Sequence, residues 1–180
     1  MLGLWWEPVT ASLALVALAE IGDKSQLVCM VLAARHGRTF PVLFGAALAF
    51  SLLNAAAALF GKALGTWLPD TWVLAAMAVL FAAFGIHALL NGDAEDGEID
   101  EQKRGHGLFV TAFLMIFLAE MGDKTQFAVA GLAGIYPALA VWLGATVALV
   151  LTAALGVLAG RTVLHRLPVA WLHRMAGVLF

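Results

Sequence analysis

One short stretch occurs twice in this chain, as AEIGDKSQ at residues 19–26 and as AEMGDKTQ at residues 119–126. Two of the eight positions differ, each by a conservative exchange, and chance does not produce such a match. The correspondence continues outside the stretch at an offset of 99 residues, which matches Gly45 with Gly144. The chain is therefore predicted to consist of two copies of one structural unit.

The composition predicts an integral membrane protein. Of the 180 residues, 63% are hydrophobic and 12% are charged, whereas about 25% of the residues of a typical soluble domain are charged. Eight of the charged residues lie within residues 93–104, so the rest of the chain has very few. The formal net charge of -2 and the lack of a basic block exclude nucleic acid as a partner, because phosphate binding requires clustered Lys and Arg.

Hydropathy along the chain predicts six transmembrane helices, the last of them cut short. A helix that spans a bilayer needs about 20 apolar residues, and the final segment has fewer. Because Phe180 matches Phe81 and the first copy continues through Leu90, we expect the intact protein to extend about nine residues beyond Phe180. The apolar segments are 8–34, 39–61, 71–92, 107–134, the part of 125–160 that follows a turn at 134–137, and 169–180.

Each copy has three helices, and this odd number determines how the copies are oriented. The second copy must enter the membrane from the opposite side, which is the inverted-repeat architecture of many secondary transporters. The predicted fold is an all-α integral membrane protein with two inverted-topology three-helix repeats. These repeats are residues 1–91 and 107–180, and residues 92–106 join them.

Basic residues orient this architecture in the membrane. The loops at 35–38, 92–106 and 161–166 share one side and contain six Lys or Arg residues, whereas Lys62 alone lies on the other side. By the positive-inside rule the first side is cytoplasmic. Both termini are then outside, and the acidic run in 92–106 is a cytoplasmic linker, either a solvated connector or a loose collector of cations near the entrance.

Charged residues in the middle of two predicted spans mark the functional site. Six ionisable groups at mid-depth would cost on the order of 15 to 20 kcal/mol if unpaired, which stability alone does not explain. On a continuous helix, Glu, Asp and Lys at positions i, i+3 and i+4 share one face, and inverted symmetry turns the two faces toward each other. The predicted metal ligands are Glu20, Asp23, Glu120 and Asp123, with Ser25, Thr125, Gln26 and Gln126 as neutral ligands and Lys24 and Lys124 as charge-balancing groups.

The charges of this site predict what it binds. Four carboxylates and two lysines sum to -2, and a dry site with that charge favours a divalent cation. Oxygen donors select hard ions, namely calcium, manganese or magnesium, of which magnesium sheds water reluctantly. The same carboxylates bind protons, so a site that alternates its access would exchange cations for protons. The alternative is that the acids and lysines form two structural salt bridges.

Several other residues carry weaker signals. Gly22 and Gly122, within the motifs, either let the helix unwind and offer backbone carbonyls or permit close helix packing. Asn54 has Ala153 at the matching position, so we expect an interhelical hydrogen bond rather than a ligand. Cys29 is the only cysteine, which excludes an internal disulfide, and no Cys/His pattern predicts structural zinc. No nucleophile is paired with a base, so no enzymatic activity, catalytic residue or bound cofactor is predicted.

The paired motifs resemble those of a known family, whose members are small membrane proteins with two Glu-x-Gly-Asp-Lys-Ser/Thr motifs. The family includes Golgi and chloroplast manganese and calcium transporters and bacterial manganese exporters. Both motifs here match without substitution, and the resemblance covers nearly the whole chain. It implies cation/proton antiport across six helices, with the four motif acids binding the cation, and it favours export of manganese from the cytoplasm across a bacterial inner (plasma) membrane. A Ca2+/H+ antiporter, a divalent-cation channel and a structural membrane protein are the alternatives, and the oligomeric state stays open.

Overall fold

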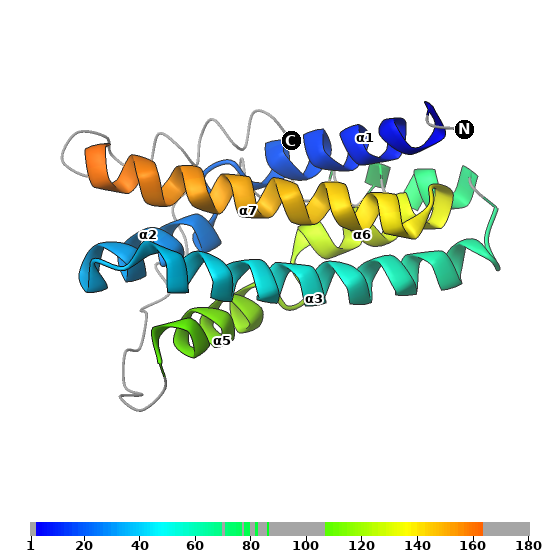
Figure 1. Cartoon of the computed structure of the whole chain (residues 1–180). Helices are drawn as coiled ribbons and strands as arrows, with labels where there is room; N and C mark the ends of the chain where they lie inside the picture. The colour runs from blue at the N-terminus through cyan, green and yellow to red at the C-terminus, as the bar shows by residue number, and fades with distance from the viewer. Residues whose placement is uncertain are drawn as a thin grey trace.

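The part of the chain that the structure describes consists of helices joined by short turns (Figure 1). This computed structural model describes residues 3–69, 71–76, 78–79, 82, 86 and 107–163. Those ranges contain no β-strand, which confirms the predicted all-α class. Residues 71–76 are helical. The labelled helices are α1 (Gly3–Glu20), α2 (Lys24–His36), α3 (Thr39–Gly65), α5 (Leu108–Glu120), α6 (Lys124–Ile135) and α7 (Ala138–Val163).

Each motif interrupts its span instead of continuing as one helix. The predicted span at 8–34 contains the end of α1 and the start of α2, and the span at 107–134 contains the end of α5 and the start of α6. The helices of each pair are separated by residues 21–23 in the first copy and 121–123 in the second. The expectation of a continuous charged helical face in each motif is therefore wrong.

Glycine explains both interruptions. Gly22 has a φ of 84° and Gly122 has a φ of 83°, a left-handed conformation that Gly adopts without steric cost and that other residues rarely adopt. One residue in this conformation ends the regular ladder of helical hydrogen bonds. A Cβ built on Gly122 would have no described atom within 4 Å, so close packing does not require glycine there. Of the two roles considered for these glycines, the backbone shows helix unwinding.

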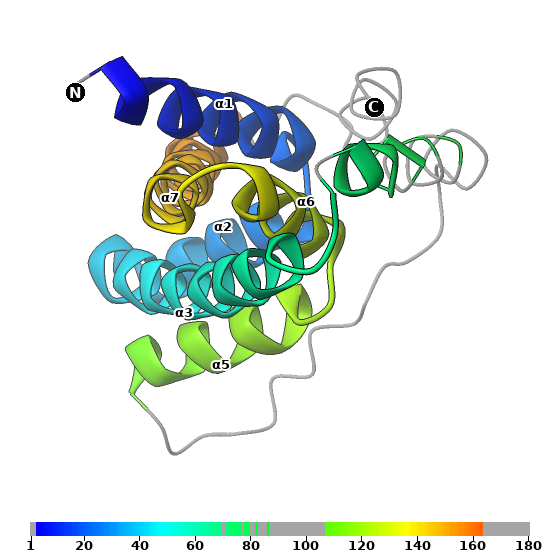
Figure 2. The same ribbon diagram turned by 90° about the vertical axis from the view of Figure 1, so that its right-hand side faces the viewer.

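The two long helices α3 and α7 hold the two copies together. α3 packs on α5 and α6 of the second copy, whereas α7 packs on α1 and α2 of the first, and α3 and α7 also contact each other. Figure 2 shows α7 between α1 and α3, and α3 between α7 and α5. The buried core includes side chains from both copies, so it lies between them and belongs to neither alone.

Glycines allow close approaches between the copies. On α3, a Cβ added at Gly45 would lie 2.5 Å from the carbonyl oxygen of Phe109 in α5. On α7, a Cβ added at Gly144 would overlap Ser12 Oγ and the carbonyl of Val9 in α1. Gly45 and Gly144 occupy matching positions in the repeat, and so do Val9 and Phe109 at an offset of 100 residues. The two copies therefore make equivalent contacts with each other.

Matching helices of the two copies run in opposite directions. In Figure 1, α1 and α2 run from right to left, whereas α5 and α6 run from left to right; α3 and α7 are opposed in the same way. This opposition is the arrangement that an inverted repeat has. The predicted linker at 92–106 and the predicted last span at 169–180 lie outside the described residues.

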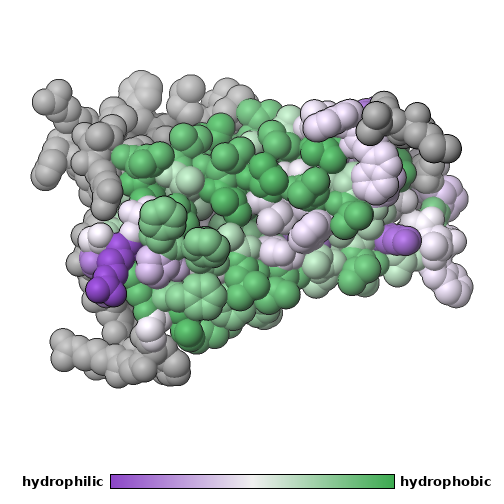
Figure 3. All heavy atoms as spheres, viewed as in Figure 1, coloured by the Kyte–Doolittle hydropathy of each residue, from purple (hydrophilic) through white to green (hydrophobic). Residues whose placement is uncertain are grey.

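One face of the molecule is broadly apolar. Figure 3 shows hydrophobic side chains over the middle of one face, with more hydrophilic ones toward its ends. Among the described helices, Thr39–Gly65 and Ala138–Leu158 are long and apolar enough to cross a membrane. Such a surface suits contact with lipid better than contact with water. Exposed side chains at four-residue spacing follow α3 and, at matching positions, α7: Phe40, Phe44, Leu48 and Leu52, then Leu139, Leu143, Val147 and Leu151.

Two polar contacts join the long helices within the core. Asn54 Nδ2 on α3 donates a hydrogen bond to Thr146 Oγ1 on α7 at 3.2 Å. Trp142 Nε1 on α7 donates to the carbonyl oxygen of Ser51 on α3 at 3.0 Å. The first contact confirms the interhelical hydrogen bond that the sequence predicted for Asn54, and both satisfy polar groups between packed apolar surfaces.

Candidate metal centre

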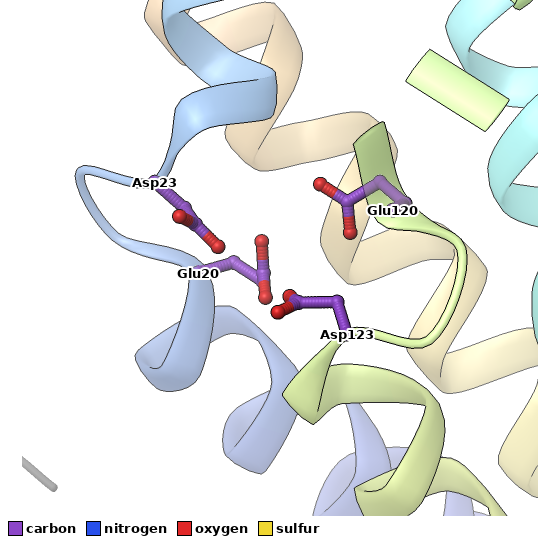
Figure 4. Close-up of side chains that lie close together, drawn as sticks. All are labelled: Glu20, Asp23, Glu120 and Asp123. Atoms are coloured by element: carbon purple, nitrogen blue, oxygen red, sulfur yellow. The ribbon is translucent and has the colours of Figure 1, made fainter. Parts of the chain in front are cut away.

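Four carboxylates meet where the two helix interruptions face each other (Figure 4). One carboxylate oxygen from each of these residues lies within 4.8 Å of the others. Glu20 is fully buried and Glu120 is only 6% exposed, so the cluster is largely removed from solvent. The structure thus brings together all four acids that the sequence singled out, which are Glu20, Asp23, Glu120 and Asp123.

A tight turn places the two acids of each copy at its ends. The backbone N–H of Asp23 donates to the carbonyl oxygen of Glu20 at 3.2 Å, and that of Asp123 donates to Glu120 at the same distance. The Glu is the last residue of the first helix, and the Asp directly precedes the second helix. Each turn therefore has one carboxylate residue at its start and one at its end.

A glutamine spans each interruption. Gln26 Oε1 accepts a hydrogen bond from the backbone N–H of Gly22 at 3.3 Å, and Gln26 Nε2 donates to the carbonyl oxygen of Glu20 at 2.7 Å. The second copy repeats both hydrogen bonds through Gln126, at 3.2 Å and 2.9 Å. Both polar atoms of each amide, which the sequence suggested as neutral metal ligands, are thus bonded to the backbone of the turn.

Hydroxyl groups cross from each copy to the glutamate of the other. Thr125 Oγ1 donates a hydrogen bond to the carboxylate of Glu20, and the side chain of Ser25 hydrogen-bonds Glu120. Both hydroxyl residues are buried, each 2% exposed. Sequence reasoning placed these residues at the site but missed the exchange of partners. The sequence did contain a signal for these contacts, because both motifs have a hydroxyl residue at the matching position, Ser25 and Thr125.

A lysine also crosses between the copies. Lys124 Nζ, from the second copy, lies 3.0 Å from Asp23 Oδ2 of the first. Both side chains are partly exposed, by 19% and 18% respectively. The side chain of Lys24 lies outside the described residues. The acids of one copy therefore find partners in the other copy, which makes the cluster one composite site instead of two separate ones.

The arrangement is chemically suited to one hard cation. Glu20 Oε2 is buried and has no hydrogen-bond partner among the described residues. Bringing like charges out of water costs several kcal/mol per ion, which a bound cation offsets. Oxygens that share one calcium ion at about 2.3 to 2.6 Å lie at most about 5 Å apart, so a spread of 4.8 Å admits a single ion. Oxygen donors without sulfur or imidazole favour calcium, manganese or magnesium.

Comparison with known proteins gives a consistent set of matches. The family model described as "Divalent cation/proton antiporter GDT1" matches residues 8–96 and 108–180. A protein of Vibrio cholerae named "Putative manganese exporter" is 34% identical over 174 residues, which are 94% of this chain and 84% of that protein. A GDT1-like protein of Synechocystis is 30% identical over 190 residues, covering 95% of this chain and 91% of the relative. "GDT1-like protein 5" of Arabidopsis thaliana is 30% identical over 207 residues, covering 95% and 90%. No solved structure matches the chain.

Proposed function

The chain belongs to the GDT1 family of divalent cation/proton antiporters, and from this premise we propose that it exports Mn2+ from the cytoplasm in exchange for protons at the four-carboxylate cluster. The observation that carries this proposal is the approach of one oxygen from each of four acids within 4.8 Å. Manganese is favoured over calcium because the relative from Vibrio cholerae is named for manganese export. Calcium uses the same oxygen donors and is the alternative cargo.

Each residue of the cluster has a role in this proposal. Glu20, Asp23, Glu120 and Asp123 bind the cation, and the hydroxyls that reach the two glutamates, Ser25 and Thr125, orient those carboxylates or add a neutral donor. Four carboxylates and two lysines sum to -2, which one divalent cation neutralises. When the cation leaves, protons bind the same carboxylates, because close like charges out of water favour the protonated form. Competition for one set of groups is what couples the two fluxes.

The proposal includes an architecture of six spans in two inverted three-helix repeats. The opposed directions of matching helices (Figure 1) and the equivalent contacts of Gly45 and Gly144 with the other copy support it. Because the acids come from both copies, rocking one copy against the other would open the cluster first to one side of the membrane and then to the other. In this proposal the chain lies in a bacterial inner membrane with both termini outside.

Transport in reconstituted vesicles tests the function. The purified full chain would be incorporated into liposomes with an imposed pH gradient, and the uptake of Mn2+, Ca2+ and Mg2+ would be followed with a cation dye beside a pH dye. We expect Mn2+ movement in one direction with proton movement in the other, in a constant ratio. Faster transport of Ca2+ than of Mn2+ would identify a calcium antiporter, and cation flux without proton movement would identify a channel and refute the exchange.

The orientation in the membrane gives a separate prediction. With Cys29→Ser as the background, a cysteine introduced by Glu98→Cys in the acidic linker is expected to react with an impermeant maleimide only from the cytoplasmic side, since the basic loops lie there. The matched variant Thr66→Cys, at an exposed position just after α3, is expected to react only from outside. Mass spectrometry after labelling of intact cells and of inside-out vesicles reads both. External labelling at position 98 would refute this orientation.

Removing the ammonium group beside Asp23 gives another prediction. Lys124 Nζ lies 3.0 Å from that carboxylate, so the substitution Lys124→Met leaves the cluster more negative. We expect Mn2+ to bind up to about tenfold more tightly, because one repulsive charge is gone, and to be released more slowly, so that turnover falls. Binding by calorimetry and initial transport rates measure the two effects. The control Lys62→Met removes an exposed lysine on α3 and is expected to change neither; weaker binding by the Lys124 variant would contradict the charge argument.

A further inference from the structure

The interruption of each motif helix leaves backbone groups that need partners. Residues after a helix end and before the next helix start cannot form the regular hydrogen bonds to the residue four positions away. At the first interruption these groups are the N–H of Gly22 and the carbonyl of Glu20, which accepts one hydrogen bond from the backbone N–H of Asp23 and can accept a second. The glutamine hydrogen bonds to these groups are partly buried in the first copy, whereas the bond from the Gly122 N–H in the second copy is exposed, so leaving such groups without partners would lower stability most in the first copy. The interruption therefore requires local compensation.

Glutamine at the third position of the following helix supplies that compensation. Helical side chains tilt toward the helix N-terminus, so Gln26 in the first turn of α2 reaches back over the interruption. Its amide accepts from Gly22 at 3.3 Å and donates to the Glu20 carbonyl at 2.7 Å. A glutamine at this position of a capping box bonds the N–H of the cap residue, whereas here the contact reaches one residue further back. Gln126 makes the same pair of bonds in the second copy.

Asp123, the residue that precedes α6, does not cap that helix with its side chain. Asp at this position ordinarily accepts hydrogen bonds from the first backbone N–H groups of the helix. Asp123 directly precedes α6, yet its side chain makes no such capping bond and instead lies in the acid cluster (Figure 4). The amide of Gln126 holds this turn by its backbone.

We propose that Gln26 and Gln126 are positioning residues that clasp the two helix interruptions and so set the spacing of the four carboxylates, instead of binding the cation themselves. This inference rests on the proposed function for its effect on cation binding, but the clasp itself is a statement about backbone hydrogen bonds. Each clasp acts on its own turn. Loss of one clasp therefore loosens one turn and leaves the other copy intact.

Amide hydrogen exchange of the full chain in detergent tests the clasp directly. The substitution Gln26→Met keeps the length of the side chain and removes both hydrogen bonds. We expect exchange in a peptide covering residues 20–26 to become about tenfold faster, as expected for loss of about one net hydrogen bond, while a peptide covering 120–126 stays as in the wild type. Gln126→Met is expected to give the reverse, so each copy is the control for the other. Unchanged exchange at the substituted turn would overturn the proposal.

Manganese binding separates a positioning role from a ligand role. Gln26→Glu keeps an acceptor for Gly22 but loses the donor to Glu20, so its exchange is expected to fall between wild type and Gln26→Met, and this variant keeps the test usable if the Met variant does not fold. We expect Gln26→Met, which leaves the charge of the cluster unchanged, to bind Mn2+ more weakly than the wild type, whereas the negative charge added by Gln26→Glu offsets part of this loss. Tighter Mn2+ binding by Gln26→Glu with unchanged exchange would show a ligand and overturn the inference. Failure of the wild type to bind any divalent cation would refute the proposed function, while the exchange data would still decide the clasp.

Discussion

The double substitution Glu20→Gln and Glu120→Gln is expected to lower Mn2+ transport per folded molecule by at least about 100-fold, which corresponds to about 2.7 kcal/mol. Gln keeps the size of Glu and an oxygen that can accept the hydrogen bond from Thr125, so the fold should survive. Each change removes one negative charge, and the site with its two lysines goes from -2 to 0. A site for a hard divalent cation depends on the number of charged ligands, so the neutral site should no longer hold the ion.

The single substitutions refine this expectation. Glu20→Gln and Glu120→Gln should each weaken Mn2+ binding about tenfold and to a similar extent, because the two residues occupy matching positions at the contact between the copies. Each also removes a proton-binding group, so the remaining transport should depend less on pH. Calorimetry gives the affinities, and initial rates in vesicles across a pH series give the coupling.

A control and a contrary result complete this test. Glu7→Gln makes the same chemical change at an exposed position of α1 outside the cluster, and it should transport as the wild type does. If the acids served only as structural salt bridges, the site variants would instead fold in lower yield with unchanged transport per molecule. Wild-type transport by the folded double variant would rule out the proposed site.

The substitution Gly122→Val is expected to weaken Mn2+ binding by about 30-fold, since holding a β-branched residue in the left-handed region costs on the order of 1 to 3 kcal/mol. Gly122 has a φ of 83°, and a Cβ added there meets no described atom within 4 Å. The expected loss therefore comes from the backbone and not from a clash. A turn that relaxes toward negative φ would displace Asp123 from the acid cluster.

Gly122→Asn is the matched control for backbone conformation. The side chain of Asn is polar and similar in bulk to that of Val, but Asn adopts the left-handed region far more readily. We expect Mn2+ binding within about fivefold of the wild type for Asn, and the same ranking of Val and Asn at Gly22, whose φ is 84°. Equal losses for Val and Asn would assign the effect to side-chain bulk, and a harmless Val would show that the turn conformation is not needed.

The fold class and the acids of the site could be predicted from the amino-acid sequence. The hydrophobic share of 63% and the clustering of charges predicted a membrane protein, and the described residues are helical, with two helices long and apolar enough to cross a membrane. The repeat of eight residues identified the four acids, because charged groups within apolar spans cost free energy and their presence in both copies indicates a function. The mismatch of Asn54 with Ala153 predicted a contact between helices, which Thr146 provides.

The geometry of the site, by contrast, depends on backbone and packing that residue spacing does not reveal. A helical wheel assumes regular φ and ψ, so it placed Glu20 and Asp23 on one continuous face, whereas a positive φ at Gly22 ends the helix between them. The reach of Gln26 back to the turn exists only because of that interruption. The sequence identifies these residues, but their hydrogen-bond partners depend on the backbone conformation of the turn.

The exchange of partners between the copies was decided by tertiary structure alone. Thr125 reaches Glu20 across 105 positions of sequence, and Lys124 reaches Asp23 across 101. Such contacts form because α3 and α7 each pack against the helices of the other copy, which brings the two interruptions face to face. Composition and repetition are properties of the chain and can be counted along it. The pairing of a carboxylate with a hydroxyl or an ammonium group depends on distances of about 3 Å, and only the packed helices determine those distances.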